Sequence, residues 1–159
     1  MITPETLVMH YRDAGLRIVT AESCTAGLLA ARITEAPGSS HVLERGFVVY
    51  SNHAKQEMLG VSAQTIEAHG AVSEPVAREM AEGALGRAQA DVAVAITGIA
   101  GPGGSETKPE GRVCFALASE GRRTLSETVE FGALGRENVR RASVDHAMSM
   151  LDAAAGEAG

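Results

Sequence analysis

Residues 91–104 read DVAVAITGIAGPGG, an apolar run followed directly by a glycine-rich segment. The run over 91–97 is short and rich in Val, Ala and Ile, which is typical of a strand that is buried on both faces of a sheet. The segment 98–104 continues neither a strand nor a helix, because its glycines and proline favour irregular backbone. This stretch therefore predicts a central strand that ends in an open loop.

Further strand and helix signals alternate on both sides of this run. Strands are predicted from apolar, β-branched segments: 16–20, 46–50, 113–118 and 124–131. Helices are predicted from capping residues and apolar spacing: from residue 4, over 26–36, from residue 52, from residue 74 and over about 137–155. Because helices separate most strands, while the last two strands must pair antiparallel, we expect an α/β fold. Its form is a three-layer α/β/α sandwich with a mixed, mostly parallel sheet.

The composition limits the functional classes. A chain of 159 residues with 45% hydrophobic and 21% charged residues predicts a single globular domain over 1–159. A net charge of −6 and 3% aromatic residues argue against nucleic-acid binding, which needs a basic face or stacking platforms. No apolar run approaches the roughly 20 residues that span a bilayer, and the N-terminus lacks the pattern of a signal peptide. We therefore expect a cytoplasmic protein with no membrane and no nucleic-acid partner.

The metal-binding residue types are scattered. Cys24 and Cys114 lie far apart in sequence, and the five histidines form no cluster with each other or with cysteine. We expect neither a metal site nor a disulfide framework, and no cofactor. The apolar content is compatible with a homo-oligomer, although the sequence does not define its order.

The segment 22–25, ESCT, follows a predicted strand at a position where open α/β sheets bind ligands. A hydroxyl at Ser23 can be exposed there, while the backbone N–H groups of Cys24 and Thr25 can stabilise an oxyanion. The alternative is that Ser23 or Thr25 only caps the next helix. Cys24 is either a rival nucleophile or a small core residue.

Tyr50 and Lys55 follow the predicted strand 46–50, in the segment YSNHAK. A lysine acts as a general base only when it is neutral, and this requires burial or neighbours that lower its pKa from about 10.4 to near 7. A solvated surface lysine is the alternative.

The glycine-rich segment and the last predicted helix supply candidate anion contacts. Backbone donors at Gly98, Ala100 and Gly101 can cradle a phosphate, although the segment matches neither a Walker loop nor a dinucleotide fingerprint. Arg136 and Arg140 can add positive charge near the start of the helix. A plain surface loop and an exposed helix face are the alternatives.

Taken together, several segments in this order resemble the CinA C-terminal domain family, whose enzymatic members are nicotinamide-nucleotide amidases. They are AESCTAGLLAARIT (21–34), RGFVVYSNHAKQEMLGV (45–61), HGAVSEPVAREMAEGAL (69–85), DVAVAITGIAGPGG (91–104) and KPEGRV (108–113). The resemblance extends over nearly the whole chain. The resemblance implies the stand-alone form of the family, so we expect no counterpart of the N-terminal domain of many longer members.

The resemblance implies a three-layer sandwich that hydrolyses nicotinamide mononucleotide to nicotinic acid mononucleotide and ammonia, a step of pyridine-nucleotide salvage. Ser23 matches the serine of the AESCT motif and is the implied nucleophile. Lys55 is the implied base, and Tyr50 orients it or relays a proton. The glycine-rich motif TGIAGP matches residues 97–102, and the arginine pattern matches Arg136 and Arg140.

Two positions depart from the family pattern. Ala26 stands where many relatives have glycine, and Glu110 stands where an aliphatic residue is common, which brings a negative charge near the phosphate-binding loop. Two other functions stay open at this point. One is a non-catalytic nucleotide-binding or competence-linked interaction module, and the other is an amidase for another carboxamide.

Overall fold

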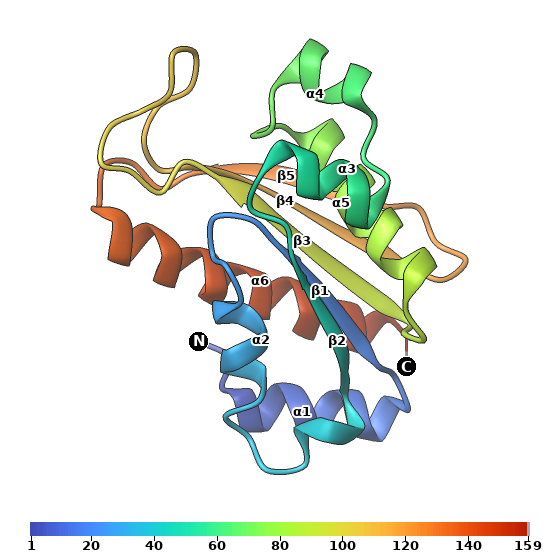
Figure 1. Ribbon diagram of the computed structural model, residues 1–159. Helices are drawn as coiled ribbons and strands as arrows, with labels where there is room; N and C mark the ends of the chain where they lie inside the picture. Colours follow the sequence, from blue (N-terminus) through green and yellow to red (C-terminus); the bar gives the residue numbers. More distant parts are fainter. Residues whose placement is uncertain (159) are drawn as a thin grey trace.

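The computed structural model describes residues 1–158 and contains one five-stranded sheet in the order β2-β1-β3-β4-β5 (Figure 1). The strands are β1 (Ile18–Glu22), β2 (Leu43–Val48), β3 (Val92–Gly98), β4 (Arg112–Ser119) and β5 (Leu125–Glu130). β1 pairs parallel with β2 and β3, whereas β4 pairs antiparallel with β3 and with β5. All strands except β4 therefore run in one direction, and the expected mixed, mostly parallel sheet is confirmed.

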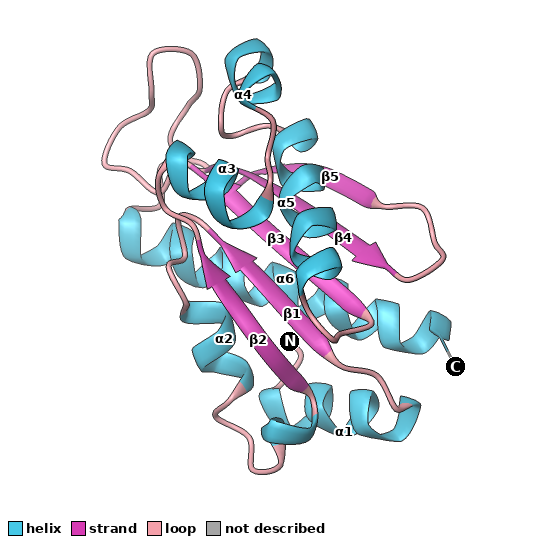
Figure 2. Ribbon diagram, turned by 45° about the vertical axis from the view of Figure 1, so that its right-hand side comes forward, coloured by secondary structure: helices cyan, strands magenta, loops and turns pink. Residues whose placement is uncertain are grey.

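Helices cover both faces of this sheet. One layer holds α1 (Pro4–Ala14), α2 (Leu28–Ile33) and α6 (Arg136–Ala158), and the other holds α3 (Asn52–Leu59), α4 (Ala63–His69) and α5 (Glu74–Arg87). Figures 1 and 2 show these two layers on opposite sides of the strands. The three-layer α/β/α sandwich predicted from the sequence is thus confirmed. No helix within residues 1–158 combines the length and apolarity needed to cross a membrane.

The central strand β3 divides its side chains by size between the two layers. Val92, Val94 and Ile96 belong to the core cluster with α1, α2 and α6, whereas Ala93 and Ala95 belong to the cluster with α5. All five side chains are buried. Small side chains on one face allow α5 to lie close to the sheet, and the larger ones fill the space under α6.

Helix starts follow the capping signals of the sequence. The side chains of Thr3, Ser51 and Ser73 accept hydrogen bonds from backbone N–H groups in the first turns of α1, α3 and α5. Pro4 and Pro75 occupy first-turn positions, where the missing N–H group costs nothing.

Three segments differ from the sequence-based expectation. The helix predicted over 26–36 is shorter, because residues 23–27 form a turn in which Ala26 (φ 48°) and Gly27 (φ 100°) adopt left-handed backbone, and α2 begins only at Leu28. The segment before α5, for which the sequence predicts neither helix nor strand, contains α4. β2 also ends at Val48, so Tyr50 lies in the turn that leads to α3.

Candidate functional site

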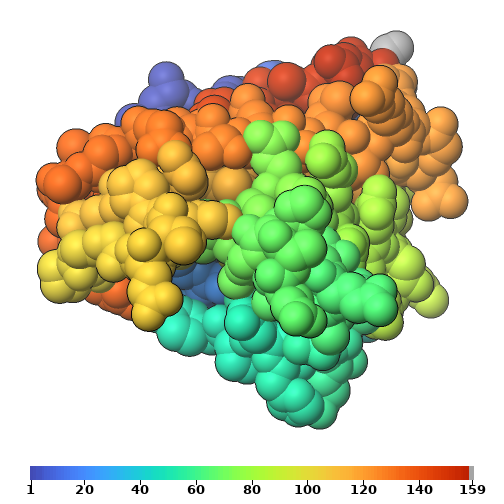
Figure 3. All heavy atoms as spheres, turned by 90° about the horizontal axis from the view of Figure 1, so that it is seen from above, coloured from blue at the N-terminus to red at the C-terminus, as the bar shows by residue number. Residues whose placement is uncertain are grey.

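A pocket of about 350 Å³ opens at the carboxyl ends of β1 and β3. This volume lies in the range of small-molecule sites. In the view from above, the hollow lies between the β3–β4 loop in yellow and the chain around α4 in green, and blue atoms from the N-terminal part of the chain form its floor (Figure 3). The lining includes every residue that the sequence singled out except Thr25 and Arg140: Ser23, Cys24, Tyr50, Lys55, Gly98, Ala100, Gly101 and Arg136.

Ser23 is held in place by β3 and is not used as a helix cap. Its backbone N–H donates to the carbonyl of Ile96 at 2.9 Å. The amides at the start of α2 are instead bound by the buried Glu22 carboxylate, which accepts from Leu29 N at 2.9 Å and from Ala30 N at 3.1 Å. The helix-capping interpretation of Ser23 and Thr25 is therefore wrong. The Ser23 hydroxyl instead lies in the lining of the pocket, where it donates to the Tyr50 carbonyl at 3.4 Å.

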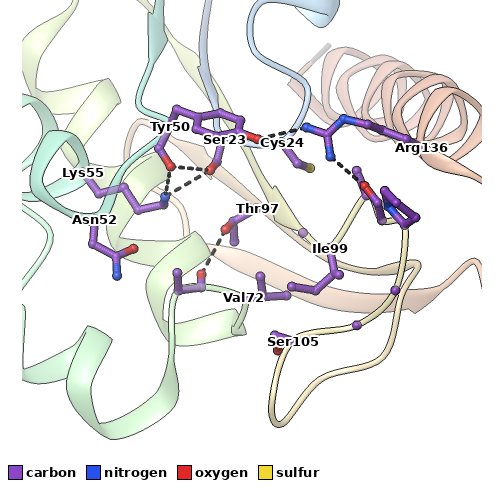
Figure 4. A pocket seen from close by; sticks show the side chains of 17 residues that line it. Ser23, Cys24, Tyr50, Asn52, Lys55, Val72, Thr97, Ile99, Ser105 and Arg136 are labelled. Carbon is purple, nitrogen blue, oxygen red and sulfur yellow. Dashed lines mark hydrogen bonds between the residues drawn. The ribbon is translucent and has the colours of Figure 1, made fainter.

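Lys55 reaches Ser23 from α3. Its Nζ donates to Ser23 Oγ at 3.0 Å and to the Tyr50 carbonyl at 3.2 Å (Figure 4). The residue is only 2% exposed, so the solvated interpretation is wrong. Burial lowers the pKa of Lys55. No salt bridge within residues 1–158 joins it to a carboxylate, and a buried ammonium without such a partner loses its proton readily.

Cys24 is a weak candidate for the nucleophile. Its side chain is 5% exposed, and burial raises the pKa of the thiol to about 11. Because the thiolate is the nucleophilic form, very little of it is present at neutral pH. The hydroxyl of Ser23, which contacts a lysine, is the better placed group.

Arg140 lies behind the Ser23 turn and outside the pocket. Its guanidinium donates to the carbonyl of Cys24 at 3.1 Å and to the carbonyl of Thr25 at 3.5 Å. It lines a separate groove between α2 and α6. The structure therefore does not bring Arg140 to the position predicted for a phosphate contact, and its guanidinium supports the turn instead. Thr25 is fully buried, and its hydroxyl has no hydrogen-bond partner in the described part of the chain.

Arg136 links two walls of the pocket. One guanidinium nitrogen donates to the carbonyl of Gly101 at 2.7 Å, and the other donates to the Tyr50 hydroxyl at 2.9 Å (Figure 4). Tyr50 is 59% exposed. It touches Lys55 through its backbone carbonyl, whereas its phenol contacts Arg136. We expected the Tyr50 side chain to orient Lys55. In the structure the backbone carbonyl of Tyr50, and not its phenol, makes the contact with Lys55.

The β3–β4 loop forms the opposite wall. The amides of Ala100 and Gly101 make no hydrogen bond within residues 1–158, and both residues line the pocket. The loop is anchored further along by Lys108, whose Nζ donates to the carbonyl of His69 at 2.6 Å and also to that of Val72. An anchored loop with free amides can bind an anion.

Sequence reasoning missed three features of the site. Thr97 is buried at the end of β3 and donates to the carbonyl of Ala71 at 3.0 Å, which fixes the wall before α5. Ala71 and Val72 also line the pocket; they lie in the segment 69–85 that carries the resemblance, but nothing in their chemistry marks them as pocket residues. Glu22 lies in the segment 22–25, but no sequence pattern marks its carboxylate as the cap of α2. Among residues 1–158 no group of three His, Cys, Asp or Glu side chains could hold a metal ion.

Comparisons with known proteins point to one family. Residues 3–155 match the model described as the CinA C-terminal domain. A CinA-like protein of Mycolicibacterium paratuberculosis is 57% identical over 142 residues, which cover 87% of this chain and 33% of the relative. A CinA-like protein of Mycobacterium marinum is 55% identical over 145 residues, which cover 91% of this chain and 34% of the relative. The chain thus spans about a third of the length of these curated relatives.

Solved structures agree with this match. The competence/damage inducible protein CihA of Agrobacterium tumefaciens superposes with a TM-score of 0.91 at 46% identity, covering 96% of both chains. A competence-damaged protein (CinA) superfamily protein of Escherichia coli superposes with a TM-score of 0.88 at 40% identity, covering 94% of this chain and 88% of that one.

Proposed function

Because the chain belongs to the CinA C-terminal domain family, we propose that it is an amidohydrolase that converts nicotinamide mononucleotide to nicotinic acid mononucleotide and ammonia. The observation that carries this proposal is the buried Lys55 amine, 3.0 Å from Ser23 Oγ at the floor of a pocket. A serine next to a lysine with a lowered pKa is a combination that performs acyl transfer.

In the proposed mechanism, neutral Lys55 accepts the proton of Ser23 as Oγ bonds to the carboxamide carbon. The tetrahedral intermediate breaks its carbon–nitrogen bond, and the Lys55 ammonium gives its proton to the departing nitrogen, which leaves as ammonia. The product of this first half of the reaction is an ester between Ser23 Oγ and the former carboxamide carbon of the nucleotide. Water then attacks the ester and gives a proton to Lys55, and this proton returns to Ser23 as the ester bond breaks.

Binding of the nucleotide is assigned to the opposite wall. The free amides of Ala100 and Gly101 and the Arg136 guanidinium would hold the 5′-phosphate, and the amides of Cys24 and Thr25 would hold the oxyanion. Energy gained at the phosphate then fixes the carboxamide against Ser23. Because free nicotinamide lacks the phosphate that supplies this binding energy, we expect it to be a much poorer substrate than its mononucleotide.

The test is ammonia release from nicotinamide mononucleotide by the purified protein, with the product identified by chromatography. We expect Ser23→Ala and Lys55→Met to lower kcat by a factor of about 10³ or more, since nucleophile and base act as a unit. Cys24→Ala is the matched control at the neighbouring residue and should retain most of the activity. Full activity in Ser23→Ala would contradict the assignment of the nucleophile. Tight binding of the mononucleotide without turnover would favour a non-catalytic binding module.

A further inference from the structure

The Glu110 carboxylate lies where the β3–β4 loop meets the start of α6. One of its oxygens accepts a hydrogen bond from Gly103 N at 2.6 Å, and the other accepts from Gly135 N, just before α6, at 3.3 Å. It also packs directly against Gly101, because a Cβ at that position would lie 2.6 Å from the carboxyl carbon of Glu110. A full negative charge is therefore fixed against a loop that lines the pocket with its residues 98–104.

Backbone amides of glycine-rich loops and of helix N-termini are the groups that attract phosphate. In this chain an internal carboxylate already occupies two such amides. We propose that Glu110 is a specificity-determining residue, an internal anion that weakens the binding of phosphate groups in the pocket. This inference rests on the proposed function, because it concerns the same pocket wall that would hold the substrate phosphate.

The charges around the pocket support this assignment. Arg136 is the one arginine that lines the pocket within residues 1–158, and both of its terminal nitrogens are engaged by Gly101 and Tyr50. The other lining cation, Lys55, is buried with a lowered pKa. The Arg136 guanidinium is thus already engaged by two walls of the pocket, and no salt bridge within residues 1–158 neutralises the Glu110 carboxylate. Because salt screens exposed charges beyond about 8 Å at physiological ionic strength, we expect repulsion from Glu110 to weaken phosphate binding only about three- to tenfold.

Glu110→Gln is the decisive variant. Glutamine keeps the size of the side chain and an oxygen for the Gly103 amide, and it removes the charge together with the acceptor for the Gly135 amide. Glu106→Gln is the matched control, because it removes the same charge from an exposed position of the same loop. Thermal unfolding of both variants establishes that each is folded before binding is compared.

The measurement is the Kd of inorganic phosphate for the full chain, by titration calorimetry at low and at high ionic strength. We expect Glu110→Gln to bind phosphate about three- to tenfold more tightly than the wild type at low salt, with a smaller difference at high salt. Glu106→Gln should stay within about twofold of the wild type. If Glu110→Gln binds phosphate as tightly as the wild type, more weakly, or not detectably, the inference is overturned. The Glu110 carboxylate would then only hold the loop in place through its hydrogen bonds.

Phosphate binding needs no turnover, so this test is separate from the test of the proposed function. Absence of ammonia release from nicotinamide mononucleotide, together with tighter phosphate binding by Glu110→Gln, would remove the proposed reaction and leave the role of Glu110 standing. Ammonia release together with unchanged phosphate binding by Glu110→Gln would support the proposed reaction and remove the role of Glu110.

Discussion

Replacing Ala26 with glycine is expected to stabilise the protein. Ala26 has a φ of 48° and is the one non-glycine residue with positive φ among residues 1–158. In this region the Cβ of an L-residue crowds the following carbonyl oxygen, which costs roughly 1–2 kcal/mol. Glycine has no Cβ and adopts the same backbone without that cost.

Two further effects set the net magnitude. Glycine makes the unfolded chain more flexible, which offsets about 0.4–1 kcal/mol of the gain. Ala26 is exposed, so the loss of its methyl group removes little packing. The free energy of unfolding should therefore rise by about 0.5–1 kcal/mol, which corresponds to an increase in Tm of about 1–4 °C for a domain of this size.

The assay is thermal and urea unfolding followed by circular dichroism, with Ala133→Gly as the matched control. Ala133 is an exposed loop residue outside the positive-φ set, so glycine there should lower the free energy of unfolding by about 0.4–1 kcal/mol. The two substitutions thus have opposite expected signs. A loss of stability in Ala26→Gly similar to that in Ala133→Gly would refute the argument that the Ser23 turn carries backbone strain.

Four further predictions test the site. Because burial lowers the pKa of Lys55 and its neutral form is the base, kcat/KM should rise with pH at values below those at which an exposed lysine titrates; a profile that falls with pH would contradict this role. For the same reason the unfolded chain binds the Lys55 proton more readily, so the free energy of unfolding should rise with pH across the interval between the folded and unfolded pKa values, and Lys55→Met should abolish this rise in urea titrations. Glu22→Ala removes the cap of α2 and should lower the free energy of unfolding by about 2–4 kcal/mol, whereas an unchanged urea midpoint would show that water replaces the carboxylate. Tyr50→Phe and Arg136→Ala should each raise KM, and a double-mutant cycle should give a coupling of about 0.5–1 kcal/mol; additive effects would mean that their hydrogen bond does not contribute to binding.

The sequence was sufficient to predict the layers and most helix starts, because these depend on local patterns. Alternating apolar segments predicted five strands, and Thr3, Ser51 and Ser73 marked helix starts that the structure confirms. α4 was missed because none of its residues is buried, so it has no apolar stripe for periodicity to detect.

The position of the two arginines depended on tertiary geometry. Arg136 and Arg140 are four residues apart on α6, and one helical turn advances about 5.4 Å along the axis. Arg136, in the first turn, reaches the β3–β4 loop, whereas Arg140 reaches the carbonyls behind Ser23. No sequence pattern distinguishes these two outcomes.

The burial of Lys55 also lay beyond sequence reasoning. Lysines are mostly exposed, and a short helix after a strand gives no reason to expect otherwise. Only the packing of α3 against α5 and the return of the chain to the end of β1 remove this side chain from water. Its contact with Ser23 joins residues 32 positions apart.

Ser23 and Lys55 follow β1 and β2, whose parallel register pairs Glu22 with Val48. The β3–β4 loop, by contrast, joins two antiparallel strands. It lies between Gly98, the last residue of β3, and Arg112, the first residue of β4, and belongs to neither strand. Under the proposed function, the reacting serine and lysine and the loop that contributes to the phosphate site are therefore encoded in separate segments of the gene. If the chain has the proposed activity, exchanging residues 99–111 would alter ligand selectivity while leaving Ser23 and Lys55 in place.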